Sequence, residues 1–133
     1  MAQKQPILKP VIWIGSSLDD LRKFPEEVRD EIGFALYQAQ LGGKHLSAKP
    51  LKGFGGAGVL EIVENHDGNT YRTVYTVKLS SALYVLHAFE KKSKKGIKTP
   101  PEEIEKVRNR LKTAIEDHKE RYEQNKQDKA ANG

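Results

Sequence analysis

The sequence contains no cysteine. This excludes disulfide bonds, zinc sites with cysteine ligands, iron–sulfur clusters and a thiol nucleophile. Long apolar runs are also missing: the longest, residues 82–89, includes a histidine and is far shorter than the ~20 residues that span a bilayer. The first ten residues, MAQKQPILKP, lack the apolar stretch of a signal peptide. We therefore expect a cytoplasmic protein with no membrane partner.

The length of 133 residues suits one domain. We expect this domain to span residues 1–122. Residues 123–133, with the sequence EQNKQDKAANG, show no apolar periodicity and are typical of a disordered tail.

The positive charge is unevenly distributed. The chain carries 23 Lys+Arg and 18 Asp+Glu, and residues 51–100 contribute eight basic and four acidic side chains to these totals. Five lysines lie between residues 91 and 98. Such a cluster is typical of a phosphate-binding surface. It is equally typical of a solvated loop, and the lysines alone do not distinguish the two.

Two apolar patterns with helical spacing precede residue 43. Ser17, with Asp20 three residues later, resembles a capping box and predicts a short helix. Pro25 suits the start of a second helix, whose apolar face recurs through residues 28–39. The glycine pair at 42–43 ends that helix. We expect the two helices to form an N-terminal helical hairpin.

The middle of the chain has the pattern of β-strands. Residues 58–65, 70–79 and 82–92 are rich in β-branched and aromatic side chains, and an Asp-Gly turn joins the first two. These segments predict an antiparallel meander, joined by an earlier strand near Ile12 or Leu51.

A C-terminal helix completes the expected fold. Thr99, with Glu102 three residues later, resembles a second capping box, and apolar residues recur on one face up to Ile115. Helices followed by a meander and a further helix predict an α+β fold, with the helical hairpin packed on a small antiparallel sheet.

The motifs for cofactor or metal chemistry are weak. Gly53, Gly55 and Gly58 spell G-x-G-x-x-G, but a strand follows them, and Lys78 stands where a dinucleotide fingerprint needs an acidic residue. The four histidines do not pair at ligand spacing, and the default interpretation of His87 is a partly buried structural histidine. We expect no cofactor and no metal ion.

Arg72 is the more informative residue, because it lies within a strand of apolar neighbours. Such an arginine either extends its head group to solvent or serves a site. An antiparallel sheet could bring Arg72, Lys52, Glu61 and Lys91 or Lys92 to one concave surface, where guanidinium and ammonium groups match a phosphodiester.

Three segments that contain these residues, PLKGFGGAGVLEIVE (50–64), YRTVY (71–75) and YVLHAFEKKSKKG (84–96), resemble the RelE/ParE superfamily of bacterial toxins. The similarity is greatest to its phage-derived, HigB-like branch. The resemblance implies a RelE-like fold and a toxin of a toxin–antitoxin system that cleaves mRNA in the ribosomal A site. It also implies a cognate antitoxin, often a helix-turn-helix protein, as partner beside the ribosome and mRNA.

The resemblance also implies roles for single residues. Arg72 corresponds to the phosphate-stabilising arginine, and Lys91 and Lys92 correspond to the basic pair that ends the last strand. Glu61 departs from the basic residue of some members, and a carboxylate there could be a general base. The remaining lysines of this surface are candidates for binding nucleic acid: Lys49, Lys52, Lys94 and Lys95.

The chemistry expected of these residues is metal-independent attack of an RNA 2′-hydroxyl on the adjacent phosphorus. Two alternatives remain open. One is inhibition of DNA gyrase by protein contact, as in ParE-like members of the superfamily. The other is a nucleic-acid-binding domain without catalysis, whose affinity would fall steeply with salt.

Overall fold

The computed structural model describes residues 8–56, 58–91 and 99–123. The elements in chain order are β1 (Val11–Trp13), α1 (Ser17–Arg22), α2 (Glu26–Gln40), β2 (Ala48–Pro50), β3 (Val59–His66), β4 (Asn69–Thr76), β5 (Leu83–Lys91), α3 (Pro101–His118) and a short π-helical segment, η1 (Lys119–Glu123).

One five-stranded sheet organises the fold, with the order β1-β5-β4-β3-β2. The three predicted strands form its antiparallel centre. Strands occur at both places where one further strand was expected: β1, which includes Ile12, pairs parallel to β5, and β2, which ends just before Leu51, pairs antiparallel to β3. The predicted α+β class, the antiparallel meander and the C-terminal helix are confirmed, but the sheet as a whole is mixed because β1 is parallel to β5.

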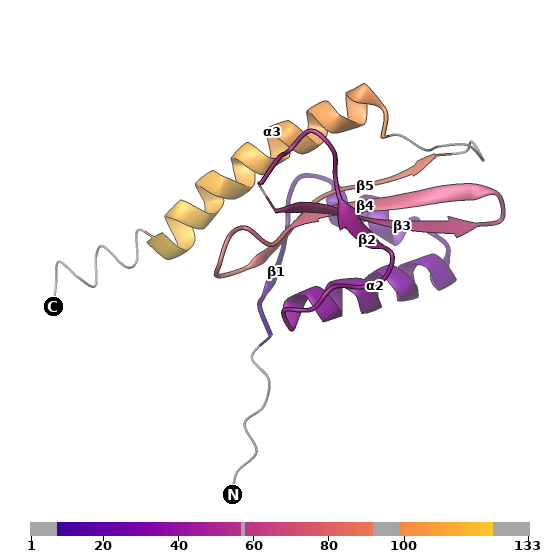
Figure 1. Ribbon diagram of the computed structural model, residues 1–133, viewed down its shortest axis with the longest axis horizontal. Helices are drawn as coiled ribbons and strands as arrows, with labels where there is room; N and C mark the ends of the chain where they lie inside the picture. Colours follow the sequence, from indigo (N-terminus) through magenta and orange to yellow (C-terminus); the bar gives the residue numbers. More distant parts are fainter. Residues whose placement is uncertain (1–7, 57, 92–98, 124–133) are drawn as a thin grey trace, which may run out of the picture.

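The sheet lies between α2 on one face and α3 on the other (Figure 1). The alternation of side chains along β4 assigns its residues to these faces. Tyr71 and Tyr75 pack with α2, and Val74 packs with α3. Arg72 has the same parity as Val74 and therefore belongs to the α3 face. A bulge beside Val74 leaves Leu86 of β5 outside the register.

The two predicted capping boxes are wrong. Ser17 is buried, and its hydroxyl donates to the carbonyl of Val85 in the adjacent strand β5, 3.2 Å away. The hydroxyl of Thr99 donates to the Glu61 carboxylate and leaves the start of α3 without a side-chain cap. In both cases a tertiary hydrogen bond replaces the local one, and Pro101 at the first position of α3 needs no cap for its missing N–H.

The N-terminal helical hairpin is not confirmed. The six-residue helix α1 packs against β5, whereas α2 packs against β3. Apart from Glu123, the predicted tail lies outside the described residues. Within the described ranges, no helix has both the length and the apolar character needed to cross a bilayer.

Candidate functional site

A pocket of about 270 Å³ lies where β2 and β3 approach the start of α3. Its lining residues are Lys49, Pro50, Leu51, Lys52, Glu61, Thr99 and Ile104. Lys52 is exposed, and the side chain of Lys49 is 56% exposed. Glu61, in contrast, is only 4% exposed. The pocket therefore combines two cations at its solvent edge with one buried carboxylate.

Both oxygens of this carboxylate are held in place. Arg72 Nη1 donates to Glu61 Oε1 at 3.0 Å, and the Thr99 hydroxyl donates to Oε2 at 3.1 Å. The Lys49 ammonium lies 3.9 Å from Oε1. Glu61 is thus a buried, oriented carboxylate with one hydroxyl donor and two basic side chains beside it.

The register of the sheet explains why these residues meet. Glu61 lies opposite Lys49 on β2 and opposite Val74 on β4, while Arg72 lies opposite Val63. Glu61 and Arg72 are therefore diagonal neighbours on one face of the hairpin, within reach of a long side chain. Arg72 is only 2% exposed and lies behind Glu61, since it does not belong to the pocket lining.

The expected concave surface is present only in part. The structure brings Glu61, Arg72, Lys49 and Lys52 together. Lys91 lies opposite Thr70, two positions beyond Phe89, which is the partner of Arg72 on β5. It belongs to the Arg72 face of the sheet but not to the pocket lining. Lys92, Lys94 and Lys95 lie outside the described residues.

A second buried polar group surrounds His87, which is 2% exposed. Arg110 Nη1 lies 3.0 Å from His87 Nδ1 and also donates to the carbonyl of Leu86. Because arginine only donates, Nδ1 accepts, and the ring proton lies on Nε2 facing the Glu103 carboxylate. Burial lowers the pKa of His87, although the hydrogen bond to Glu103 opposes this shift. His87 is therefore a neutral, doubly hydrogen-bonded ring.

The partners that α3 and the segment just before it supply to these two groups were not predicted from the sequence. Thr99 was assigned to a cap, and Glu103 and Arg110 were assigned no role. Nothing in their spacing identifies them, because their positions depend on how α3 docks on the sheet. The pairing of Glu61 with Arg72 did have a signal: counting back from the Asp-Gly turn places Arg72 opposite Val63.

One grouping with metal-ligand chemistry is present among the described residues, on the α2 side of the molecule. Potential ligand atoms of Glu31, His45 and Glu64 lie within 4.8 Å of one another. His45 Nδ1 accepts the backbone N–H of Ser47 at 3.0 Å, which places the ring proton on Nε2, 2.7 Å from Glu31. These hydrogen bonds explain why His45 and Glu31 lie close together. A metal ion bound to Nε2 would have to displace its proton.

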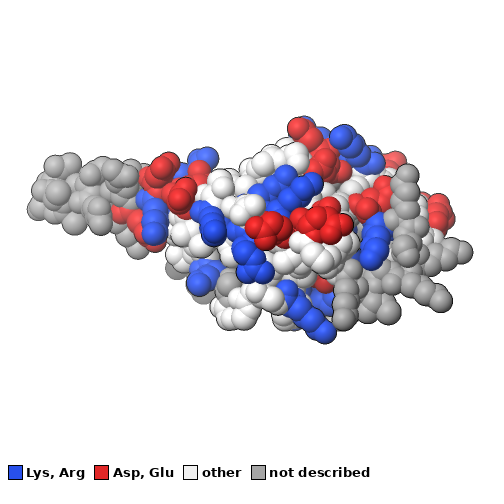
Figure 2. Space-filling view, turned by 90° about the horizontal axis from the view of Figure 1, so that it is seen from above, with Lys and Arg blue, Asp and Glu red and all other residues white. Residues whose placement is uncertain are grey.

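The surface over α3 carries charges of both signs. Figure 2 shows lysine and arginine side chains beside aspartate and glutamate on this face. The cations of the pocket rim therefore act locally rather than through a broad field of one sign, because neighbouring opposite charges offset one another and salt screens exposed charges beyond about 10 Å.

The comparisons with known proteins yield one match. No curated protein and no solved structure matches this chain. The family model of the phage derived protein Gp49-like family (DUF891) matches residues 19–112, which include β2 to β5, the buried carboxylate and the first two-thirds of α3. This family is associated with RelE-type and other toxin-like proteins. The chain belongs to the phage-derived Gp49-like family.

Proposed function

We propose that this protein is a toxin of the RelE/HigB type that cleaves mRNA on the ribosome. The observation that carries the proposal is the carboxylate of Glu61, which Arg72 and Thr99 hold at a pocket with lysines at its rim. RNA cleavage without a metal needs a base, positive charge near the phosphate and a proton donor for the leaving oxygen. The pocket offers residues for each of these roles.

Glu61 is the proposed general base. Its carboxylate takes the proton of a 2′-hydroxyl, and the 2′-oxygen forms a bond with the adjacent phosphorus. The bond from phosphorus to the 5′-oxygen breaks, which leaves a 2′,3′-cyclic phosphate and a 5′-hydroxyl. Thr99 and Arg72 fix the two carboxylate oxygens, so Glu61 does not need to reorganise during proton transfer.

The lysines at the rim supply charge. Lys49 and Lys52 line the pocket and match the anionic phosphate. Lys52 is the proposed proton donor for the leaving 5′-oxygen, because it lines the pocket and is exposed. Lys91 and Lys92 are the alternatives that the toxin resemblance supplies. Arg72 acts through Glu61 in this arrangement and is a positioning residue, because the carboxylate separates it from the pocket.

The ribosome has a defined role in this proposal. Attack in line with the leaving oxygen requires a twisted RNA backbone, and holding reactants in that geometry accounts for a large part of such a barrier. We propose that the ribosomal A site presents mRNA in this conformation. Pure protein is then expected to cleave free RNA far more slowly than translated mRNA.

A toxin needs an inhibitor in its own cell, and we propose a helix-turn-helix antitoxin as partner. The apolar face of α3 is not available to it, because Val107 and Ala114 are buried against the sheet. The rim of Lys49 and Lys52 remains exposed, and an acidic segment that covers it would block substrate and neutralise both cations.

Glu61→Gln tests the proposal, because the amide keeps the shape of the side chain and removes the base. The assay maps new 5′ ends of mRNA in a cell-free translation reaction. Loss of a general base is expected to reduce cleavage about 10²–10⁴-fold. The matched control is Glu64→Gln, which makes the same change three positions along β3, on the opposite face of the sheet.

Cleavage by Glu61→Gln at the wild-type rate would contradict the assignment of the base. Intact mRNA with wild-type protein would contradict the ribonuclease proposal itself. The alternatives would then be gyrase inhibition, scored by loss of DNA supercoiling activity, or binding without catalysis.

A further inference from the structure

The loop before β3 and the outer face of α3 meet at an aromatic–cation contact. The loop between β2 and β3 reaches up to α3 (Figure 1). The Cζ atom of Arg108 lies 5.1 Å from the centroid of the Phe54 ring, a cation–π distance. Phe54 packs partly buried against the α3 side of the core, whereas Arg108 is exposed. The guanidinium therefore has an aromatic ring beneath it and solvent beyond it.

The backbone of the loop allows this approach. Gly53 has a φ of +98°, in the region that favours glycine, and a Cβ there would lie 4.0 Å from Arg108 Nη2. A side chain at this position would strain the backbone, although its Cβ would meet the guanidinium only at ordinary contact distance. The loop is thus shaped to hold Phe54 under Arg108.

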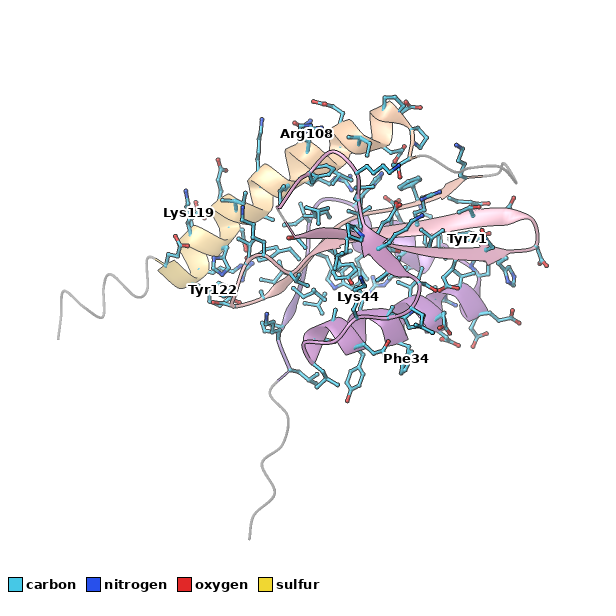
Figure 3. The ribbon with its side chains drawn as sticks, in the orientation of Figure 1. Phe34, Lys44, Tyr71, Arg108, Lys119 and Tyr122 are labelled. Carbon is cyan, nitrogen blue, oxygen red and sulfur yellow. The ribbon has the colours of Figure 1, made fainter. Side chains whose placement is uncertain are left out.

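The contact lies at the edge of the pocket that contains Glu61. Lys52, which precedes Gly53, lines the pocket, and so does Ile104, which precedes Arg108 by one turn of α3. One helical turn advances about 5.4 Å. A nucleotide chain with a phosphate beside Lys52 would therefore bring a neighbouring base to Arg108. Figure 3 shows Arg108 in the first half of α3, on the side from which the loop approaches.

The positive charge at this edge is available to a ligand. Within the described part of the chain, neither Lys52 nor Arg108 has a carboxylate within ion-pair distance. Single-stranded RNA is bound in proteins by stacking its bases on aromatic rings and arginine planes, next to cations that follow the backbone. The Phe54 ring, the Arg108 guanidinium and Lys52 together provide these groups at the pocket edge.

We propose that Phe54 and Arg108 form a stacking platform for the nucleobase next to the phosphate in the pocket. The base stacks on the outer side of the guanidinium, and the Phe54 ring supports it from below. The identification of the ligand as RNA rests on the proposed function. The platform recognises a base by its π face, so it fixes the position of the strand without reading its sequence.

Binding of a non-cleavable RNA tests the platform. The probe is a short, fluorescein-labelled single strand with 2′-O-methyl riboses, and its affinity is measured by fluorescence anisotropy over a salt series. Arg108→Lys keeps the charge and removes the planar group, so we expect binding about tenfold weaker with the same salt dependence. Phe54→Leu removes the support and is expected to weaken binding in the same direction.

Two controls separate stacking from charge and from misfolding. Lys119→Ala removes one exposed charge from η1, well beyond Arg108 along the same helical stretch, and is expected to leave binding nearly unchanged (Figure 3). A probe with abasic sites has no base to stack, so wild type and Arg108→Lys should bind it equally. Arg108 is exposed, and its substitution decides the question if Phe54→Leu fails to fold.

Equal binding of the RNA probe by wild type and Arg108→Lys would overturn the platform, as would a wild type that binds no RNA at low salt. The proposed function fails separately. If the wild type cleaves translated mRNA but Arg108→Lys binds the RNA probe as tightly as the wild type, the proposed function stands and the platform is contradicted. If Arg108→Lys weakens RNA binding but the wild type does not cleave translated mRNA, the platform stands and the proposed function is contradicted.

Discussion

The two faces of the sheet are built from different side chains. The face toward α2 is apolar, and its strands contribute Ile62, Tyr71, Tyr75, Leu83 and Val85. The face toward α3 also has an apolar cluster, but among the described residues its strands additionally bury Glu61, Arg72 and His87. The named side chains of both faces are buried, so burial alone does not explain the difference.

The difference indicates what each face is for. Apolar side chains gain free energy when they leave water, at about 25 cal/mol per Å² of area. A buried ion pair gains little, because the loss of hydration offsets most of the attraction between the charges. The pairing of Glu61 with Arg72 is therefore weak evidence for stability. In the proposed function, the pair instead holds a fixed carboxylate at the pocket.

Breaking the pair should give the largest effect on folding. Arg72→Met removes one partner of the buried Glu61 carboxylate and leaves it, among the described residues, with Thr99 and the exposed Lys49. We expect the free energy of unfolding to fall by about 3–5 kcal/mol, measured by urea denaturation. Arg29→Met removes the same charge from an exposed position of α2 and should change stability by less than about 0.5 kcal/mol. Equal stability of the two variants would contradict this account.

A cavity on the apolar face should separate stability from activity. Ile32 of α2 is completely buried, and Ile32→Ala is expected to cost about 2–5 kcal/mol. Because Ile32 lies on the far side of the sheet from the pocket, cleavage per folded molecule should stay at the wild-type level. The measurement is mRNA cleavage at a temperature where the variant remains folded. Loss of cleavage in the folded variant would show that the two faces are not independent.

The turn signal in the sequence predicted the composition of the α3 face better than the helix-capping signals did. The Asp-Gly turn fixes the β3–β4 register, and this register alone puts Glu61 beside Arg72 on one face. The capping predictions were wrong because the hydroxyls of Ser17 and Thr99 donate to groups of the sheet instead of capping their own helices. Local patterns could not predict those partners, since they depend on the docking of distant elements.

The same limit applies to the surroundings of His87. The sequence predicted a partly buried histidine, and the structure buries it almost completely. Glu103 and Arg110 come from α3, and no spacing in the sequence relates them to β5. The lysine cluster illustrates the opposite case: it was the plainest signal in the sequence, yet Lys92, Lys94 and Lys95 lie outside the described residues.

The neutral His87 predicts a smaller, pH-dependent effect on the α3 face. Burial lowers its pKa below the ordinary 6.5, an effect that Arg110 and Lys106 reinforce and Glu103 opposes. Below pH 6.5 the unfolded chain takes up a proton that the folded protein resists, so stability is complete above this pH and falls as the pH decreases. Urea denaturation at several pH values should show a steeper loss for wild type than for His87→Gln. Identical slopes would contradict the assignment.

The most direct test of the central claim removes both charges at once. Glu61→Leu combined with Arg72→Met replaces the ion pair by apolar side chains, a change that is often neutral or stabilising. We expect a free energy of unfolding equal to or above that of the wild type, together with complete loss of mRNA cleavage in the translation assay. A folded double variant that still cleaves mRNA at the wild-type rate would contradict the claim that this pair serves the chemistry of the pocket.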